Sequence, residues 1–90
     1  MVATAKSDLN DIVEYLSRFY PSSALNQYDK IIEKIKNLEQ FPLMYEEYKS
    51  AVSSFNYRKM VVDNYLVFYV VLDETVEIHA IINAKMNYGM

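Results

Sequence analysis

The sequence predicts an α+β domain in which an N-terminal helix hairpin packs on a three- to four-stranded antiparallel sheet. Two observations lead to this prediction. Apolar residues recur at helical spacing over residues 5–40, and residues 57–83 contain three short apolar runs separated by turn residues. A chain of 90 residues is long enough for one small core. Residues 1–90 are therefore expected to form a single domain.

Residues 5–20 form the first predicted helix. Thr4 or Ser7 is expected to cap its N-terminus, with Asp8 favourable in the first turn. A proline after Tyr20 ends the helix. Residues 1–4 are expected to be a short or truncated first strand. The apolar residues that share one helical face are Leu9, Ile12, Val13, Leu16, Phe19 and Tyr20.

Residues 23–40 form the second predicted helix. The connection to the first helix is only a few residues long, so the two helices are expected to pack as an antiparallel hairpin. The tyrosines on the apolar faces, including Tyr15, Tyr20 and Tyr28, are expected to lie in the core. Residues 43–55 show no periodicity and are predicted to be a loop.

Three strands are expected in the C-terminal half. Residues 65–72 are apolar on both alternating faces, which is typical of a central strand. Asp63 and Asn64 tolerate positive φ and suit a two-residue turn before it, whereas residues 73–75 suggest a looser turn after it. Residues 76–83 alternate, which predicts a half-buried strand. Its core face would consist of Val76, Ile78, Ala80 and Ile82, opposite Glu77, His79, Ile81 and Asn83.

This arrangement leaves the second face of the central strand without a cover. A helix hairpin covers one face of a sheet, and each large apolar side chain on the other face loses about 1.5–3 kcal/mol of burial. The cover is expected to come from the 43–55 loop, from the N-terminal segment or from a partner chain. The side chains concerned are Leu66, Phe68, Val70 and Leu72, or alternatively those of the other face, Tyr65, Val67, Tyr69 and Val71.

Composition limits the possible functions. The absence of cysteine excludes a disulfide framework, a thiolate zinc site and a cysteine nucleophile. A net charge of −3 argues against nucleic-acid binding through bulk charge alone. One histidine with scattered carboxylates is no recognisable metal site, and neither a metal nor another cofactor is expected. No apolar run is long enough to span a bilayer and no signal peptide is recognisable, so a cytoplasmic location without membrane partners is expected.

Several segments together indicate a family. They are the opening A-K-S-D-L-N-D-I-V-E-Y-L, the helix end L-E-Q-F-P, and Y-R-K-M-V-V-D-N-Y-L-V-F-Y-V-V followed by V-E-I-H-A-I-I-N. In their order and spacing, over nearly the whole chain, the sequence resembles the RelE/ParE superfamily of plasmid-stabilisation toxins from bacterial type II toxin–antitoxin modules. The resemblance implies a growth inhibitor neutralised by a cognate antitoxin in a toxin–antitoxin hetero-oligomer. Such an antitoxin would also supply the missing cover of the sheet.

The resemblance leaves the target open between two activities. RelE-like members cleave messenger RNA on the ribosome without a metal, and ParE-like members inhibit DNA gyrase without a catalytic site. The RelE-like chemistry uses cations on the sheet and an aromatic residue or a histidine near the C-terminus, which act on the phosphate and on the transferred protons. The catalytic candidates that correspond are Arg58, Lys85, Tyr88 and His79, with Lys49 as a further cation.

The main prediction is a ribosome-dependent mRNA endoribonuclease. However, Leu66 and Met86 stand where RelE-like nucleases tend to carry arginine, so the set of cations is small. This keeps two alternatives open: a gyrase inhibitor, and a degenerate toxin that retains only antitoxin binding. It also leaves structural interpretations for Arg58 as a solvated or salt-bridged arginine and for His79, which shares a strand face with Glu77, as a satisfied sheet histidine.

Overall fold

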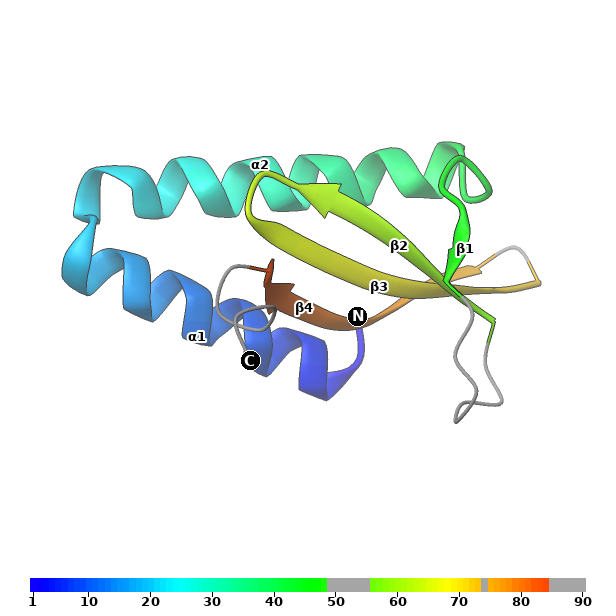
Figure 1. The fold of residues 1–90 in the computed structure, drawn as a ribbon, viewed down its shortest axis with the longest axis horizontal. Coiled ribbons are helices and arrows are strands. Elements are labelled where there is room, and N and C mark those ends of the chain that lie inside the picture. Colours follow the sequence, from blue (N-terminus) through cyan, green and yellow to red (C-terminus); the bar gives the residue numbers. More distant parts are fainter. Residues whose placement is uncertain (49–55, 74, 85–90) are drawn as a thin grey trace.

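The computed structural model describes residues 1–48, 56–73 and 75–84. Two helices, α1 (Ala3–Phe19) and α2 (Pro21–Gln40), precede four strands, β1 (Glu47–Tyr48), β2 (Tyr57–Val62), β3 (Tyr65–Leu72) and β4 (Thr75–Asn83). The strands form one antiparallel sheet in the order β1-β2-β3-β4, and the helices form a hairpin beside it (Figure 1). This confirms the predicted α+β architecture. None of the helices described is long and apolar enough to cross a membrane.

The start of α1 differs from the prediction. Val2 occupies the N-cap position without a capping side chain, and both Thr4 and Ser7 lie inside the helix, so the predicted caps are wrong. Asp8 has a different role, because its carboxylate accepts a hydrogen bond from the backbone N–H of Ile81 in β4, at 3.0 Å. This bond ties the first turns of α1 to the edge strand of the sheet.

The fourth strand is not where it was expected. Residues 1–4 form no strand, since α1 begins at Ala3 and only the N–H of Val2 bonds to β4, at the carbonyl of Ile78 (3.0 Å). Figure 1 places the N-terminus beside β4 accordingly. The additional strand is β1, within the segment predicted to be a loop, and it pairs with the first residues of β2. Two residues are too few to show a strand periodicity, which explains why the pattern missed them.

The two hairpin turns of the sheet are both tight. Asp63 and Asn64 connect β2 to β3 as predicted, and Asp63 takes a positive φ of 52°. The second turn is shorter than expected, because Leu72 pairs with Thr75 and Thr75 therefore belongs to β4. Asp73 has a φ of 57° there, a conformation that aspartate tolerates better than most residues.

The core lies between the helix hairpin and one face of the sheet. Helix α1 packs along β4, and α2 contacts β2 and β4. Tyr69 is fully buried in the centre, and its hydroxyl donates a hydrogen bond to the carbonyl of Pro42 at 3.1 Å. Burial raises the pKa of this phenol, and the charge of Arg58 opposes that effect. The buried cluster consists of Ala5, Leu9, Ile31, Leu38, Met60, Val62, Tyr65, Val67, Tyr69, Ile78 and Ile81.

A β-bulge interrupts the alternation of β4. Phe68 of β3 pairs with Ala80, but the next residue, Tyr69, pairs with Ile78. His79 is thus the extra residue on β4. The bulge moves every following residue to the opposite face, so the core set predicted for this strand is wrong after Ile78. Ile81 is buried in the core, whereas Ala80 and Ile82 lie on the other face beside Phe68 and Leu66.

Several helix aromatics expected in the core are exposed. Tyr15, Tyr20 and Tyr28 all retain a large part of their accessible surface, as do Phe19 and Leu25. The reason is visible in Figure 1, where the end of the hairpin that connects α1 to α2 projects beyond the sheet. Phe19, Tyr20 and Leu25 lie at that connection, whereas Tyr15 lies farther along α1, where it lines a hollow together with Tyr65 and Asn83 of the sheet.

Candidate site on the outer face of the sheet

The sheet face opposite the helix-packed core is called the outer face here. Its members in β2 and β3 follow from the register of the strands, in which Lys59 pairs with Phe68 and Val61 with Leu66. Leu66 and Val70 are almost completely buried, although neither belongs to the cluster packed against the helices. The chain itself therefore already covers Leu66 and Val70, two of the four side chains that were expected to need a partner.

A histidine held by two partners lies on this outer face. The hydroxyl of Tyr57 in β2 lies 3.0 Å from Nδ1 of His79, and the two rings meet edge to face with centroids 5.4 Å apart. The other ring nitrogen, Nε2, lies 2.5 Å from Oε1 of Glu77. The side chain of His79 is 16% exposed and that of Glu77 is 38% exposed. The three residues are called the Tyr57–His79–Glu77 cluster below.

The direction of these hydrogen bonds follows from the groups involved. An ionised carboxylate only accepts, so Nε2 carries the proton that is shared with Glu77. In the neutral imidazole Nδ1 is then an acceptor, and the hydroxyl of Tyr57 donates to it. The order carboxylate, imidazole, hydroxyl is the order in which a base is oriented and a hydroxyl is activated in hydrolytic triads.

The structure does not bring Arg58 to this cluster. Arg58 pairs with the fully buried Tyr69, so its side chain projects from the helix-covered face. There it donates a hydrogen bond of 2.6 Å to the carbonyl of Tyr45 and lies 3.6 Å from a carboxylate oxygen of Glu47. Its side chain is only 18% exposed. Arg58 and His79, predicted to act at one site, lie on opposite faces of the sheet.

The remaining predicted site residues are only partly placed. Lys85, Tyr88 and Lys49 lie outside the described residues, as does Met86. Lys59 does lie on the outer face, two residues from Tyr57 on the same strand. Within the described ranges no group of three histidine, cysteine or acidic side chains could hold a metal ion.

Sequence reasoning named His79 as a site candidate and placed Glu77 on its strand face, but it did not indicate Tyr57. Glu77 and His79 are two residues apart, so their shared strand face was expected from the pattern. Tyr57 is 22 positions away from His79, and only the register of the folded sheet brings it there. The alternation of β2 does place Tyr57 and Arg58 on opposite faces, and this was the available signal.

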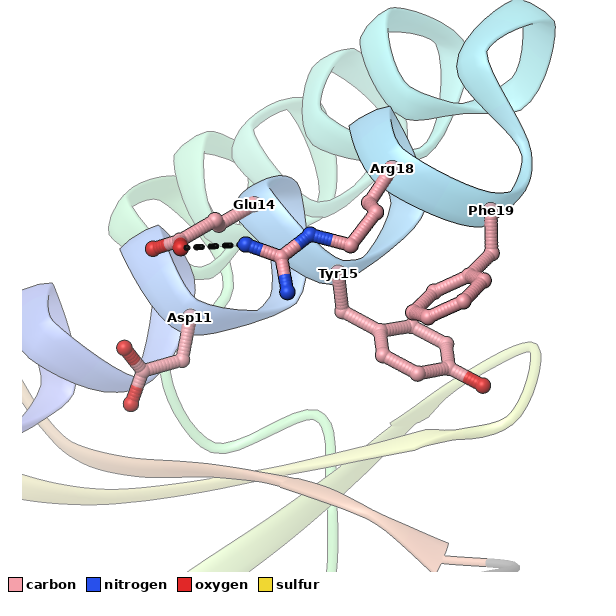
Figure 2. Close-up of a pocket in the computed structure, with 5 residues that line it drawn as sticks. All are labelled: Asp11, Glu14, Tyr15, Arg18 and Phe19. Carbon is pink, nitrogen blue, oxygen red and sulfur yellow. Dashed lines mark hydrogen bonds and ion pairs between the residues drawn. The ribbon is translucent and has the colours of Figure 1, made fainter.

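A second surface feature lies on α1, far from these residues in the sequence. Asp11, Glu14, Tyr15, Arg18 and Phe19 line a hollow of about 230 Å³. Figure 2 shows the rings of Tyr15 and Phe19 next to each other, with centroids 4.9 Å apart, and the ion pair of 3.4 Å between Arg18 and Glu14. This hollow is an exposed, partly aromatic surface with an acidic border.

Comparison with known proteins gives a family for the whole chain. A family model described as the ParE toxin of the type II toxin-antitoxin system, parDE, matches residues 2–88. The comparison with curated proteins found no match. The matched range includes both helices, the sheet and the Tyr57–His79–Glu77 cluster.

Proposed function

From the premise that the chain belongs to the ParE toxin family of type II toxin–antitoxin systems, we propose that it inhibits growth as a ribosome-dependent mRNA endoribonuclease. Membership of the family implies a cognate antitoxin as its partner. The choice of messenger RNA as the target is supported by one observation, the hydrogen-bonded histidine of the outer face.

Metal-free cleavage of RNA needs three kinds of groups. A base removes the proton of the 2′-hydroxyl, a cation stabilises the charge that develops on the phosphate, and an acid or water protonates the departing 5′-oxygen. The Tyr57–His79–Glu77 cluster supplies a base whose ring is held at both nitrogens. Lys59 supplies a cation on the same face. The outer face therefore has the chemistry for the first two requirements.

A second candidate function is inhibition of DNA gyrase without catalysis. It is favoured by the position of Arg58, which bonds to Tyr45 and Glu47 on the face away from His79. The cation that was expected to complete the nuclease site is thus used in holding β1 against β2. A gyrase inhibitor needs a binding surface only, and the loss of this cation from the site would not affect it.

One experiment separates the candidates. The chain is expressed from an inducible promoter beside a His79→Gln variant, and messages from both cultures are mapped by primer extension. Cuts within codons that disappear in the variant support the endoribonuclease. Growth arrest with intact messages, together with loss of supercoiling by purified gyrase, supports the second candidate. The absence of any arrest, with the antitoxin still bound, indicates a toxin that retains only antitoxin binding.

The exposed side chains of the helix hairpin are a proposed contact surface for the antitoxin. A group of exposed apolar residues is usual at protein interfaces, and such a group lies around Phe19, whereas Leu66 and Val70 of the predicted row are buried. Phe19→Asp is expected to weaken binding of the antitoxin by roughly 30-fold, as for a central interface residue. Val61→Asp, an equally exposed position on the outer face, is the control. A loss of binding in the Val61 variant alone would place the antitoxin on the sheet instead.

A further inference from the structure

We propose that the antitoxin segment that contacts α1 carries an arginine side chain next to an apolar one, and that two neighbouring hollows on α1 bind these two side chains. This inference rests on the antitoxin contact surface proposed above and adds the chemistry of the segment that occupies it. The first hollow is aromatic with an acidic border, and the second is mainly apolar.

The first hollow, called the aromatic hollow, has the features of a binding site for an organic cation. It has a volume of about 230 Å³, and the adjacent rings of Tyr15 and Phe19 form one side of it (Figure 2). The carboxylates of Asp11 and Glu14 also line it. An aromatic ring attracts a cation over its face, and a carboxylate adds a charge-assisted hydrogen bond. The hollow is therefore complementary to a positively charged side chain.

The residues of the aromatic hollow are accessible to a partner. Tyr15 is 47% exposed and Phe19 is 57% exposed, although both rings are large and apolar. Asp11 is exposed as well. The ion pair of 3.4 Å between Arg18 and Glu14 has side chains that are 68% and 72% exposed. Such a pair contributes little to stability, so a cation from a partner competes for the carboxylate of Glu14 at little cost.

The second hollow, called the apolar hollow, adjoins the first. It has a volume of about 250 Å³ and lies where α1 meets the sheet, with Ile12 on the helix and Tyr65 and Asn83 on strands β3 and β4. Burial raises the pKa of the Tyr65 phenol, so the part of the hollow that the sheet forms is uncharged at neutral pH. Asp11 and Tyr15 line both hollows. An apolar side chain is therefore the occupant that fits the second hollow.

The short distance between the hollows limits the sequence of the partner. Asp11 and Tyr15 are four positions apart on one helix, where side chains at this spacing are neighbours with about 5–6 Å between their Cβ atoms. A segment that fills both hollows presents its two anchor side chains on one face. In a helix they are about three or four residues apart, and in a strand about two.

Charge and shape favour arginine as the first anchor. The chain has a net charge of −3, and the aromatic hollow contributes two carboxylates against the single guanidinium of Arg18. A basic segment is therefore attracted to this surface and an acidic segment is repelled. The planar guanidinium of arginine also stacks on an aromatic ring and bonds to a carboxylate through two N–H groups at once, which the ammonium of lysine does not.

The test measures binding of the cognate antitoxin to the full chain by isothermal titration calorimetry. Asp11→Lys reverses one charge of the acidic border, and the fold is retained because lysine is a better helix former than aspartate. The affinity is expected to fall by about tenfold at low salt and by less at high salt, since salt screens exposed charges. Glu39→Lys, on an exposed residue at the far end of α2 (Figure 1), makes the same change in net charge and should bind as the wild type does.

Two variants of Tyr15 test the role of its ring. Tyr15→Ala removes a wall that both hollows share, and the affinity is expected to fall by about tenfold or more, as for a central interface residue. Tyr15→Phe keeps the aromatic face and should bind within about twofold of the wild type. An equally large loss in both variants would show that the hydroxyl makes the contact and would overturn the cation site on the ring.

The outcomes separate this inference from the contact surface on which it rests. If Phe19→Asp weakens binding but Asp11→Lys binds like Glu39→Lys, the antitoxin occupies α1 without a basic anchor, and the inference is overturned while the surface stands. Tighter binding by Asp11→Lys would identify an acidic segment and would overturn the inference as well. If neither Phe19→Asp nor Asp11→Lys changes the affinity, the antitoxin binds elsewhere, and the contact surface fails together with the inference.

Discussion

Replacing Arg58 with alanine is expected to destabilise the fold and not merely to remove a catalytic group. The guanidinium is 18% exposed, and its hydrogen bond to the carbonyl of Tyr45 is 2.6 Å long. The variant leaves this carbonyl without its donor and removes the ion pair that joins β1 to β2 through Glu47. The first effect is therefore expected at the β1 edge of the sheet.

The size of the effect can be worked out from these two contacts. A hydrogen bond from a charged donor contributes about 1.5–3 kcal/mol to the free energy of unfolding. The ion pair adds about 0–1 kcal/mol, because the carboxylate of Glu47 is 45% exposed and largely screened. The sum of about 2–4 kcal/mol is a large part of the roughly 5–13 kcal/mol typical for a domain of this length. The melting temperature should fall by roughly 10–30 °C.

Thermal and urea unfolding, followed by circular dichroism, measure this change. The matched control is Arg18→Ala, since Arg18 makes an exposed ion pair of 3.4 Å with Glu14 within α1 and should contribute less than about 0.5 kcal/mol. Equal stability of the two variants would refute the structural role given to Arg58. It would also reopen Arg58 as a residue available to a substrate. Until that comparison is made, a loss of toxicity in Arg58→Ala is no evidence for catalysis.

Two further predictions concern side chains that hold the sheet. Asp8→Ala leaves the buried N–H of Ile81 without its acceptor and should lower the free energy of unfolding by about 1–3 kcal/mol, whereas Asp8→Asn keeps an acceptor and should lose about half as much in urea titrations. The hydrogen bond and charge of Lys30 lower the pKa of Asp63 below its ordinary value. This carboxylate therefore stabilises the folded state at neutral pH, and the contribution disappears as the pH falls below about 4. The stabilities of wild type and Asp63→Asn, measured against pH, should differ slightly at pH 7 and converge in acid, and a constant difference would contradict the assignment.

The parts of the fold that the sequence predicted are those with local signals. The stripe of apolar residues on each helix continues over several turns, and the Asp63–Asn64 turn depends on the backbone preferences of two residues. The central position of β3 followed from its apolar character on both faces. In each case the information lies within a single segment, the longest of which is the 20 residues of α2.

The features that the sequence did not predict depend on contacts between distant segments. The strand β1 has only two residues and exists because it pairs with β2. The N–H of Ile81 bonds to Asp8, although 73 positions separate them. The exposure of Phe19 and Tyr20 depends on how far the hairpin extends beyond the sheet (Figure 1). None of these can be read from periodicity, because periodicity describes one element at a time.

In the candidate site, too, the features that the sequence did not predict depend on contacts between distant segments. Here they depend on the bulge at His79. Without the bulge, strict alternation would move Ile81 out of the core. The backbone N–H of Ile81, which donates a hydrogen bond to the carboxylate of Asp8, would then point away from α1. The bulge keeps Ile81 buried while His79 stays beside Glu77 and Tyr57 on the outer face. A change that weakens the bulge should therefore reduce stability and cleavage together, as expected for Asp8→Ala. The His79→Gln variant should reduce cleavage alone, and this separation distinguishes a chemical role of the imidazole from the structural role of the bulge.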